Sequence, residues 1–374
     1  MSEHAIDPSS TLPEFTERAE LRARIAIYLG AGGDVRILRK TIAQFGSGLA
    51  ALLSPTLPAR LRSEASSTGM ARRVDAVLAR TEALGGRWVA SGFPGFPSAL
   101  AQSDVVLLCV AGELPVGPMV TLVGSRDAEE YGLWCARALS GAIAGAGGVV
   151  VSGGAKGIDS ASHDGAVDGG GRTVVVLGQG LGSALASGQG DAYRRWCDHG
   201  AVISEYLPDA HGSKQSFPER NRIVAALGVC TVVVQAAIKS GTLITARLAR
   251  ELGRPVFVIP GEVGQAPCAG SNALIESGEG RALTAPSALA AVTGMPSLSG
   301  VSFPSRRGRA STGFLAAEAD PVAAMHPAVR FLREAGPQTS TSLVAQFGAE
   351  WLGVALELEL EGVIRRDAEG RYFA

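Results

Sequence analysis

Residues 149–167, VVVSGGAKGIDSASHDGAV, predict a strand, a glycine-rich loop and a helix in direct succession. Three consecutive valines are typical of a strand that is buried on both faces. Gly153 and Gly154 then allow a sharp turn, and Asp159 suits the first turn of a helix. Such a loop exposes backbone N–H groups to a ligand, and Lys156 adds a positive charge. The stretch therefore indicates an anion-binding loop in an α/β fold.

The same pattern extends through the chain from about residue 119. Short β-branched runs alternate with helical stretches; the runs are MVTLV (119–123), GVVVS (148–152), TVVVLG (173–178), AVIS (201–204), VCTVVVQ (229–235) and PVFVIP (255–260). Continuous apolar strands separated by helices predict an extended Rossmann-like, doubly wound α/β domain with a mostly parallel sheet. Ligands of such domains lie at the carboxyl ends of the strands, so we expect the site in the loops there.

The regions on either side of these strands have different residue patterns. Up to about residue 100, apolar residues recur at helical spacing, and Asp34 after two glycines predicts a helix N-cap. Near the C-terminus, about three short helical patterns and two strand-like pieces predict a small winged helix. The predicted domains are a helical N-terminal domain of the SAM or helix-hairpin-helix type (1–105), the Rossmann-like domain (106–294), a flexible linker rich in Ser, Pro and Gly (295–325) and the winged helix (326–374).

Composition excludes several classes of protein. Hydrophobic residues make up 46% of the 374 residues, yet no apolar run approaches the ~20 residues that span a bilayer. The N-terminus lacks the basic and apolar regions of a secretion signal, so we expect a cytoplasmic protein. The five cysteines and five histidines are dispersed, which disfavours disulfides and a metal site. The net charge of −1 requires that any polyanion binds a local patch.

Spacing separates the loop at 152–159 from two common nucleotide motifs. A Walker A loop needs a lysine followed by Ser or Thr, whereas Gly157 follows Lys156 here. The dinucleotide fingerprint needs a third glycine, and GQGLGS at 178–183 has Ser183 at that position. The sequence therefore disfavours both ATP and NAD as ligands.

Candidates for catalytic residues have weak support in the sequence. Asp159 and His163 are four residues apart and would share a helix face, but we favour structural roles for both. Glu205 lies at a strand end and could act as a general base, although no nucleophile is identifiable beside it. We therefore expect no catalytic residue.

The segment 213–254 has a strong excess of positive charge. Its seven cations and two acids give a net charge of +5, against −1 for the whole chain. Phe217 lies among these cations, and this combination suits base stacking together with neutralisation of phosphates. Of Arg247, Arg250 and Arg254, we expect at least one only to solvate an amphipathic helix. The other cations are Lys214, Arg220, Arg222 and Lys239.

As a set, seven motifs resemble those of the DNA-processing protein A family, also called DprA or Smf. They are GSR (124–126), SGGAKGID (152–159), SEY (204–206), FPERNRIV (217–224), SGTLITA (240–246), IPG (259–261) and GSNALI (270–275). The resemblance implies a protein that binds single-stranded DNA without sequence preference, protects it, and loads a RecA-type recombinase in natural transformation and recombination. It also implies a homodimer that has no catalytic activity and needs no cofactor.

By the same resemblance, several loops would line one DNA groove. Lys156 stands where family members more commonly have arginine, which keeps the charge but loses the planar fork that binds phosphate. The implied DNA-binding residues are Gly124, Ser125, Arg126, Gly153, Gly154, Lys156, Lys214, Phe217, Arg220, Asn221, Arg222, Ser240, Gly241 and Thr242.

An alternative function is that of a nucleotide-processing enzyme of the lysine-decarboxylase-like Rossmann group. Those enzymes carry a PGGxGTxxE stretch. The corresponding KSGTLITARLA at 239–249 keeps Gly241 and Thr242 but has no second glycine pair and no suitably placed acid. This difference disfavours the enzyme.

The predicted winged helix has an unusual charge for a DNA-binding module. The helix expected at 348–362 has four glutamates and no cation. A helix that enters the major groove neutralises phosphates with Lys and Arg, so DNA should repel this one. We therefore expect the winged helix to contact protein, which disfavours a sequence-specific transcription factor.

Overall fold

The computed structural model of the chain divides into two compact units, Met1–Ala310 and Ser311–Ala374. The structure describes residues 8–304, 331–332, 335–348, 351, 355, 364–367 and 369–373.

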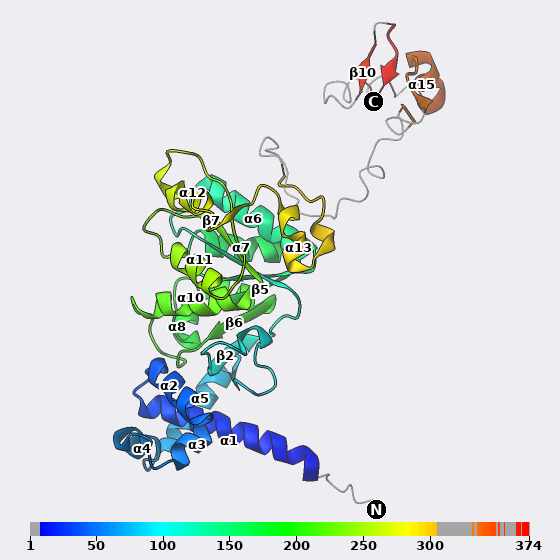
Figure 1. Ribbon diagram of the computed structural model, residues 1–374. Coiled ribbons are helices and arrows are strands. Elements are labelled where there is room, and N and C mark those ends of the chain that lie inside the picture. The colour runs from blue at the N-terminus through cyan, green and yellow to red at the C-terminus, as the bar shows by residue number, and fades with distance from the viewer. Residues whose placement is uncertain are drawn as a thin grey trace, which may run out of the picture. The chain divides into compact units, whose positions relative to one another are not determined.

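The first unit is built on a nine-stranded sheet within residues 8–304 (Figure 1). Its spatial order is β1-β2-β6-β5-β4-β3-β7-β8-β9. The strands are β1 (Gly86–Ala90), β2 (Leu107–Gly112), β3 (Met119–Gly124), β4 (Val149–Ser152), β5 (Arg172–Val176), β6 (Gly200–Ser204), β7 (Cys230–Gln235), β8 (Val256–Val258) and β9 (Arg281–Ala282). From β6 to β9 in spatial order, neighbouring strands run parallel, whereas β1 and β2 pair antiparallel. The predicted doubly wound, mostly parallel sheet is confirmed.

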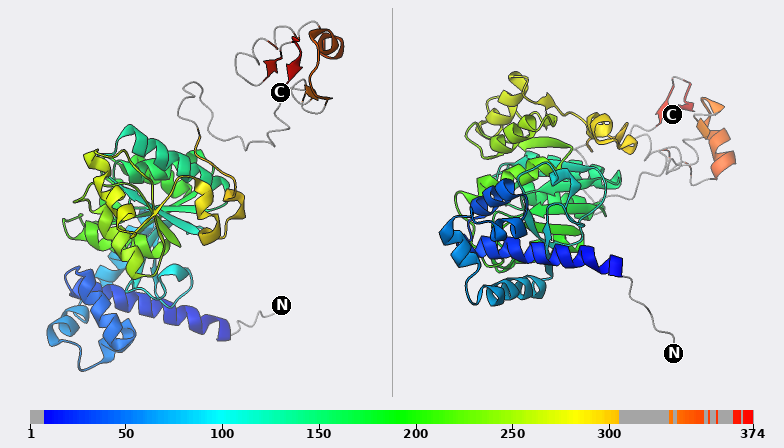
Figure 2. Two further views of the ribbon diagram at one scale, coloured as in Figure 1. Left: turned by 45° about the horizontal axis from the view of Figure 1, so that its top comes forward. Right: turned by 60° about the horizontal axis from the view of Figure 1, so that its bottom comes forward.

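Helices cover both faces of this sheet (Figure 2). Side chains alternate along β4, because Val150 packs with α6 and α7 whereas Val149 and Val151 pack with α10 and α11. This two-sided burial explains the unbroken apolar runs. The helices of this layered part are α6 (Glu130–Gly145), α7 (Ile158–Asp168), α8 (Leu181–Leu185), α9 (Gly190–Asp198), α10 (Ser216–Leu227), α11 (Thr242–Glu251), α12 (Ala269–Glu276) and α13 (Ala290–Thr293). None of the helices in the described part of the chain is long and apolar enough to cross a membrane.

The N-terminal helices pack at the β1–β2 end of the sheet (Figure 1). They are α1 (Pro8–Gly30), α2 (Val35–Phe45), α3 (Gly48–Leu53), α4 (Ala59–Ala65) and α5 (Met70–Ala83). The predicted N-cap is confirmed, because the Asp34 side chain accepts the N–H of Arg36. The expectation of helical structure up to about residue 100 is wrong for β1. Trp88 and Ala90 face the helices while Val89 faces the opposite core, and this alternation belongs to a strand.

The second unit contains a short helix and a hairpin among its described residues. Helix α15 (Ser340–Phe347) begins after Thr339, whose side chain accepts the N–H of Ser342. Strands β10 (Arg365–Arg366) and β11 (Tyr372–Phe373) pair antiparallel, so the two predicted strand-like pieces are confirmed. Among the described residues of this unit, a buried apolar cluster is formed by Leu332, Leu343, Trp351, Ala355, Ile364 and Tyr372.

The predicted linker and the predicted winged helix lie largely in residues that the structure does not describe. Most of the expected acidic helix at 348–362 lies outside the described residues, so the winged helix stays a prediction. The predicted linker lies outside them from residue 305 to residue 325. The preceding Met295 and Leu298 are buried in the first unit, rather than forming the start of a flexible linker. The domain boundaries stay predictions.

A buried ion pair connects the N-terminal helices to the sheet region. The Arg24 guanidinium donates to Glu20 Oε1 at 2.6 Å and to the carbonyl oxygen of Val106 at 2.6 Å, and both charged side chains are at most 4% exposed. The Glu20 carboxylate also accepts the N–H groups of Gly48 and Leu49. Although burial acts to raise the pKa of Glu20, these amides and Arg24 hold it below its usual value. The pair therefore joins α1, α3 and the segment before β2.

Replacing Arg24 with methionine should destabilise the protein strongly. Arg24→Met leaves a buried carboxylate without its cation, which should lower the free energy of unfolding by about 3–5 kcal/mol in urea denaturation. Arg22 is the matched control, because it pairs with Asp75 at 2.6 Å on the solvent side of the same helix. Arg22→Met should cost no more than about 1 kcal/mol. Equal losses in the two variants would contradict the importance of the buried pair.

Candidate nucleic-acid interface

A pocket of about 420 Å³ opens at the carboxyl edge of the sheet. The loops after β3, β4 and β7 and the start of α10 form its walls. This volume lies within the ~300–1,000 Å³ that is typical of ligand pockets. We call it the first pocket. The predicted DNA-binding residues that line it are Gly124, Ser125, Arg126, Phe217, Arg220, Asn221, Ser240, Gly241 and Thr242.

A second pocket of about 440 Å³ adjoins the first. Gly153, Gly154 and Lys156 of the glycine-rich loop line it. The two pockets share four wall residues, which are Arg126, Ala155, Phe217 and Arg220. The structure thus brings twelve of the predicted residues to one continuous edge.

The loop after β3 packs directly against the loop after β4. The N–H of Ile158, at the start of α7, donates to the carbonyl oxygen of Ser125 at 3.1 Å. A side chain at Gly157 would collide with this carbonyl, and a side chain at Gly124 would collide with Ile158. The N–H of Ala155 donates to the carboxylate of Asp159 at 3.3 Å. The first amide of α7 is therefore used inside the protein, so the expected open helix N-terminus is not available at Ile158.

Arg220 is a buried part of the wall between the pockets. Its guanidinium donates to the carbonyl oxygens of Gly153 and Val176, and the residue is 4% exposed. The guanidinium fills the space that a side chain at residue 153 would need, which explains the glycine there. Burial lowers the pKa of Arg220, and the Asp159 carboxylate opposes this shift. Arg220 therefore shapes the site and is not a solvated cation.

The same wall also contains the exposed Arg126 and the half-buried Phe217. The guanidinium carbon of Arg126 lies 5.6 Å from the centroid of the Phe217 ring, within reach of a cation–π interaction. Phe217 is half-buried, because its ring lies directly against the backbone of Gly178 and Gly212. A planar cation beside a fixed ring offers a nucleobase a stacking surface.

Two of the predicted DNA-binding residues do not line either pocket. Arg222 lies beside Glu205 Oε2 at 2.5 Å and beside Asp104 Oδ1 at 3.1 Å, and its side chain is 19% exposed. Lys214 is exposed but stands apart from the two pockets. Glu205, which the sequence suggested as a possible general base, is not free in the structure. Its buried carboxylate pairs with Arg222.

Three arginines in the second half of the basic segment 213–254 have partners within the protein. Arg250 pairs with Glu279 at 2.5 Å, and Arg247 lies 3.8 Å from Glu251. Arg254 donates to the carbonyl oxygen of Gly228. None of these three arginines is among the described lining residues of the two pockets, and the expectation that at least one only solvates an amphipathic helix stays a prediction.

His163 is a structural residue, as expected. Its Nδ1 lies 2.6 Å from Thr173 Oγ1, and the threonine hydroxyl donates to the carbonyl oxygen of Val150. Because the hydroxyl proton is used in this bond, His163 donates from Nδ1, and burial keeps the ring neutral. Burial lowers the pKa of His163 from 6.5 to about 3.

Sequence analysis missed four polar residues that line the second pocket, which are Gln179, Ser187, Gln189 and Tyr193. They lie on the segment from β5 to α9. In this segment the sequence offered only the incomplete dinucleotide fingerprint GQGLGS. Its glycines serve packing instead: Gly178 lies against Phe217, and Gly180 lies against the carbonyl oxygens of Leu207 and Pro208. Gln179, which lies between these two glycines, was the one signal that the fingerprint itself offered.

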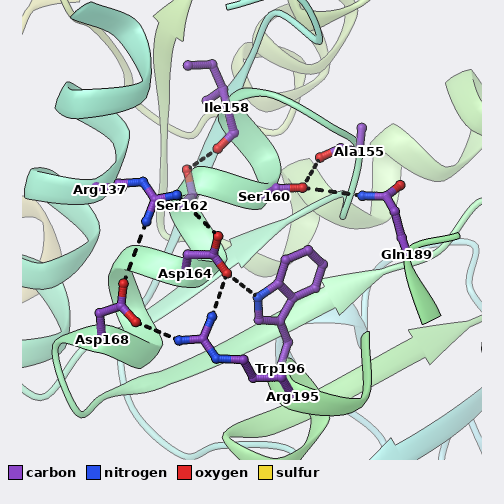
Figure 3. Close-up of polar contacts among 10 residues, drawn as sticks. All are labelled: Arg137, Ala155, Ile158, Ser160, Ser162, Asp164, Asp168, Gln189, Arg195 and Trp196. Atoms are coloured by element: carbon purple, nitrogen blue, oxygen red, sulfur yellow. Dashed lines mark hydrogen bonds and ion pairs between the residues drawn. The ribbon is translucent and has the colours of Figure 1, made fainter. Parts of the chain in front are cut away.

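A network of ion pairs fixes α7, whose first turn approaches the second pocket (Figure 3). Asp164 accepts from Arg195 at 2.9 Å and from the Trp196 indole at 2.9 Å, while Asp168 accepts from Arg195 at 2.6 Å. Arg137 of α6 lies within 3.6 Å of both carboxylates. Helices α6, α7 and α9 are therefore tied together behind the site.

The fold and the pockets define a Rossmann-like α/β protein with cations and an aromatic ring at its loop edge. Residues 88–293 match the family model described as DNA recombination-mediator protein A. The chain belongs to this family of DNA-processing proteins, and the resemblance inferred from the motifs is confirmed.

Individual relatives agree with this assignment. DNA processing protein DprA of Streptococcus pneumoniae is 39% identical over 181 residues, which are 46% of this chain and 62% of that protein. Protein Smf of Escherichia coli is 36% identical over 186 residues, which are 49% of this chain and 50% of that protein. The matches thus span between half and two thirds of these relatives. The X-ray structure of the S. pneumoniae protein matches with a TM-score of 0.56 at 28% identity, covering 74% of this chain and 95% of that chain.

The buried His163 should make stability depend on pH. Its folded pKa of about 3 lies below the unfolded value of 6.5, so the unfolded state binds a proton first as pH falls. Stability should be full above pH 6.5 and should fall below it by up to about 1.4 kcal/mol per pH unit. Urea denaturation between neutral and acidic pH measures this slope. His163→Gln should make the slope shallower, whereas His211→Gln at an exposed site should retain it; an unchanged slope in His163→Gln would contradict the assignment.

Proposed function

We propose that this protein binds single-stranded DNA without sequence preference along the two adjoining pockets. The observation that carries the proposal is the shared wall, where the exposed Arg126 lies beside the fixed ring of Phe217. Cations next to an aromatic surface suit a flexible strand whose bases are unpaired. A duplex keeps its base faces stacked inside, so it cannot use the ring.

The chemistry of the walls divides into phosphate and base contacts. Arg126 and Lys156 are both exposed and come from the two loops that pack into one body, so their charges have a fixed scaffold for successive phosphates. Asn221 lines the first pocket and can both donate and accept hydrogen bonds. Stacking tolerates any base, because every base has a π-face. This division supports binding without sequence preference.

The proposed role in the cell follows from the family. Its description as a recombination mediator and the DNA-processing names of the relatives support a role in DNA processing during natural transformation and recombination. We extend this role to protection of the bound strand, to loading of a RecA-type recombinase and to action as a homodimer.

We also propose that the protein has no catalytic activity. Asp159 is the one carboxylate among the described residues of the first pocket, and it accepts the Ala155 N–H beside Arg220. A hydrolase would need a carboxylate placed to activate water. Incubation with nucleoside 5′-monophosphates should release no free base, as measured by chromatography. Base release that Asp159→Asn abolishes would support the alternative enzyme.

The salt dependence of binding tests the DNA site. Labelled oligo-dT should bind more tightly than a matched duplex, and its affinity should fall steeply with salt. Each lost phosphate contact should lower the slope of log affinity against log salt by ~0.7, so Arg126→Ala with Lys156→Ala should lower it by ~1.4.

Two further variants make this test specific. Arg172 is exposed at the start of β5, at the opposite edge of the sheet, so Arg172→Ala should keep the wild-type slope. Arg126→Lys keeps the charge but loses the planar group beside Phe217, so it should retain the slope and lose affinity. An unchanged slope in the double variant would exclude these loops as the DNA site.

A further inference from the structure

We propose that the second pocket is a base-binding subsite in which Gln179 and Gln189 hydrogen-bond the edge of an unpaired nucleobase. This inference rests on the proposed binding of single-stranded DNA and extends it. It assigns a role to the segment between β5 and α9, which contributes nothing to the first pocket.

The second pocket has the parts that a whole nucleotide needs. Its volume is about 440 Å³, and Arg126 and Lys156 place positive charge on its wall. Asp127 is the one carboxylate among the described lining residues, so these two cations and the buried Arg220 outnumber it. The neutral amides of Gln179 and Gln189 belong to the same wall. Cations suit the phosphate, and the amides suit the uncharged base.

The backbone of Gln179 and the side chain of Gln189 each make a hydrogen bond within the protein. The carbonyl oxygen of Gln179 accepts the hydroxyl of Ser204 at 2.7 Å, and the Gln179 residue is half-buried. The side chain of Gln189 donates to Ser160 Oγ at 3.4 Å, which Figure 3 shows next to the loop at Ala155. The long distance makes this a weak bond that a ligand can replace. A strand would therefore meet one amide on an anchored backbone and one whose weak bond it can replace.

A carboxamide suits binding without sequence preference. It carries two donors and an acceptor, and rotation of the group by half a turn exchanges their positions. One glutamine can thus match the donor and acceptor patterns of different bases. Tyr193 also lines the pocket, and its hydroxyl donates to the carbonyl oxygen of Gly154 at 3.1 Å, so this proton is not free to select a base.

The position of the shared wall sets the size of the ligand. Arg126 and Phe217 line both pockets, so they stand between two bases that occupy the pockets in succession. The smallest unit that uses the whole site is then a dinucleotide, with the shared wall in the stacking position between its bases.

Comparing an oligonucleotide with an abasic oligomer of the same length distinguishes binding of the bases from binding of the phosphates. The probes are oligo-dT of about 12 nucleotides, a length near one binding site, and an abasic oligomer of the same length. The variant Gln179→Ala with Gln189→Ala should bind oligo-dT about tenfold more weakly, since it loses two hydrogen bonds, and should bind the abasic oligomer as the wild type does. Lys156→Ala should weaken binding of both probes by the same factor.

Controls keep the test decisive. Gln102→Ala removes an exposed glutamine outside both pockets and should leave both affinities unchanged. If the double variant melts below the wild type, Gln179→Ala alone carries the test, because Gln179 bonds Ser204 through its backbone. Equal loss on both probes, or no loss, overturns the base subsite while leaving the DNA-binding function intact. Wild-type protein that fails to bind oligo-dT overturns both.

Discussion

The buried guanidinium of Arg220 is the contact on which the whole loop edge depends. It reaches from α10 across the ends of β4 and β5, and it donates to the carbonyl oxygens of Gly153 and Val176. A buried charge is costly unless it is hydrogen-bonded and faces an opposite charge; the two carbonyl oxygens supply hydrogen bonds, the neighbouring Asp159 supplies the charge, and the Arg220 Nε is left without a partner. Because the guanidinium occupies the space beside residue 153, glycine is required there. One side chain thus determines the common wall of both pockets.

The arginines of α10 show how closely spaced residues take opposite roles. Arg222 is two positions after Arg220, so it projects from the far side of the helix. There it lies between Glu205 and Asp104, and Asp104 also accepts from Arg39 of α2 at 2.7 Å. These alternating charges join α10 to the N-terminal helices, as the Glu20–Arg24 pair joins α1 to the segment before β2. The helix that presents the site is therefore fixed from both sides.

The sequence was sufficient to predict the sheet and the edge at which the pockets lie, because buried parallel strands impose unbroken apolar runs and their carboxyl ends must coincide. It could not separate Arg220 from Arg222, which occur in one motif and differ only in their tertiary partners. It also could not show that two arginines of the basic segment have partners within the protein. Arg250 pairs with the Glu279 carboxylate, and Arg254 donates to the carbonyl oxygen of Gly228. Gln179 and Gln189 were missed because their loop carries no charge. The early strand β1 was missed because it has only five residues and follows a long helical pattern.

The contact between the loops after β3 and β4 limits how their lengths can change. The Ser125 carbonyl accepts the N–H of Ile158, and no side chain fits at Gly157 between them. A residue inserted in either loop would break this contact and displace the other loop as well. The two loops are therefore constrained to keep their lengths together, whereas an exposed side chain such as that of Lys156 can change without disturbing the contact.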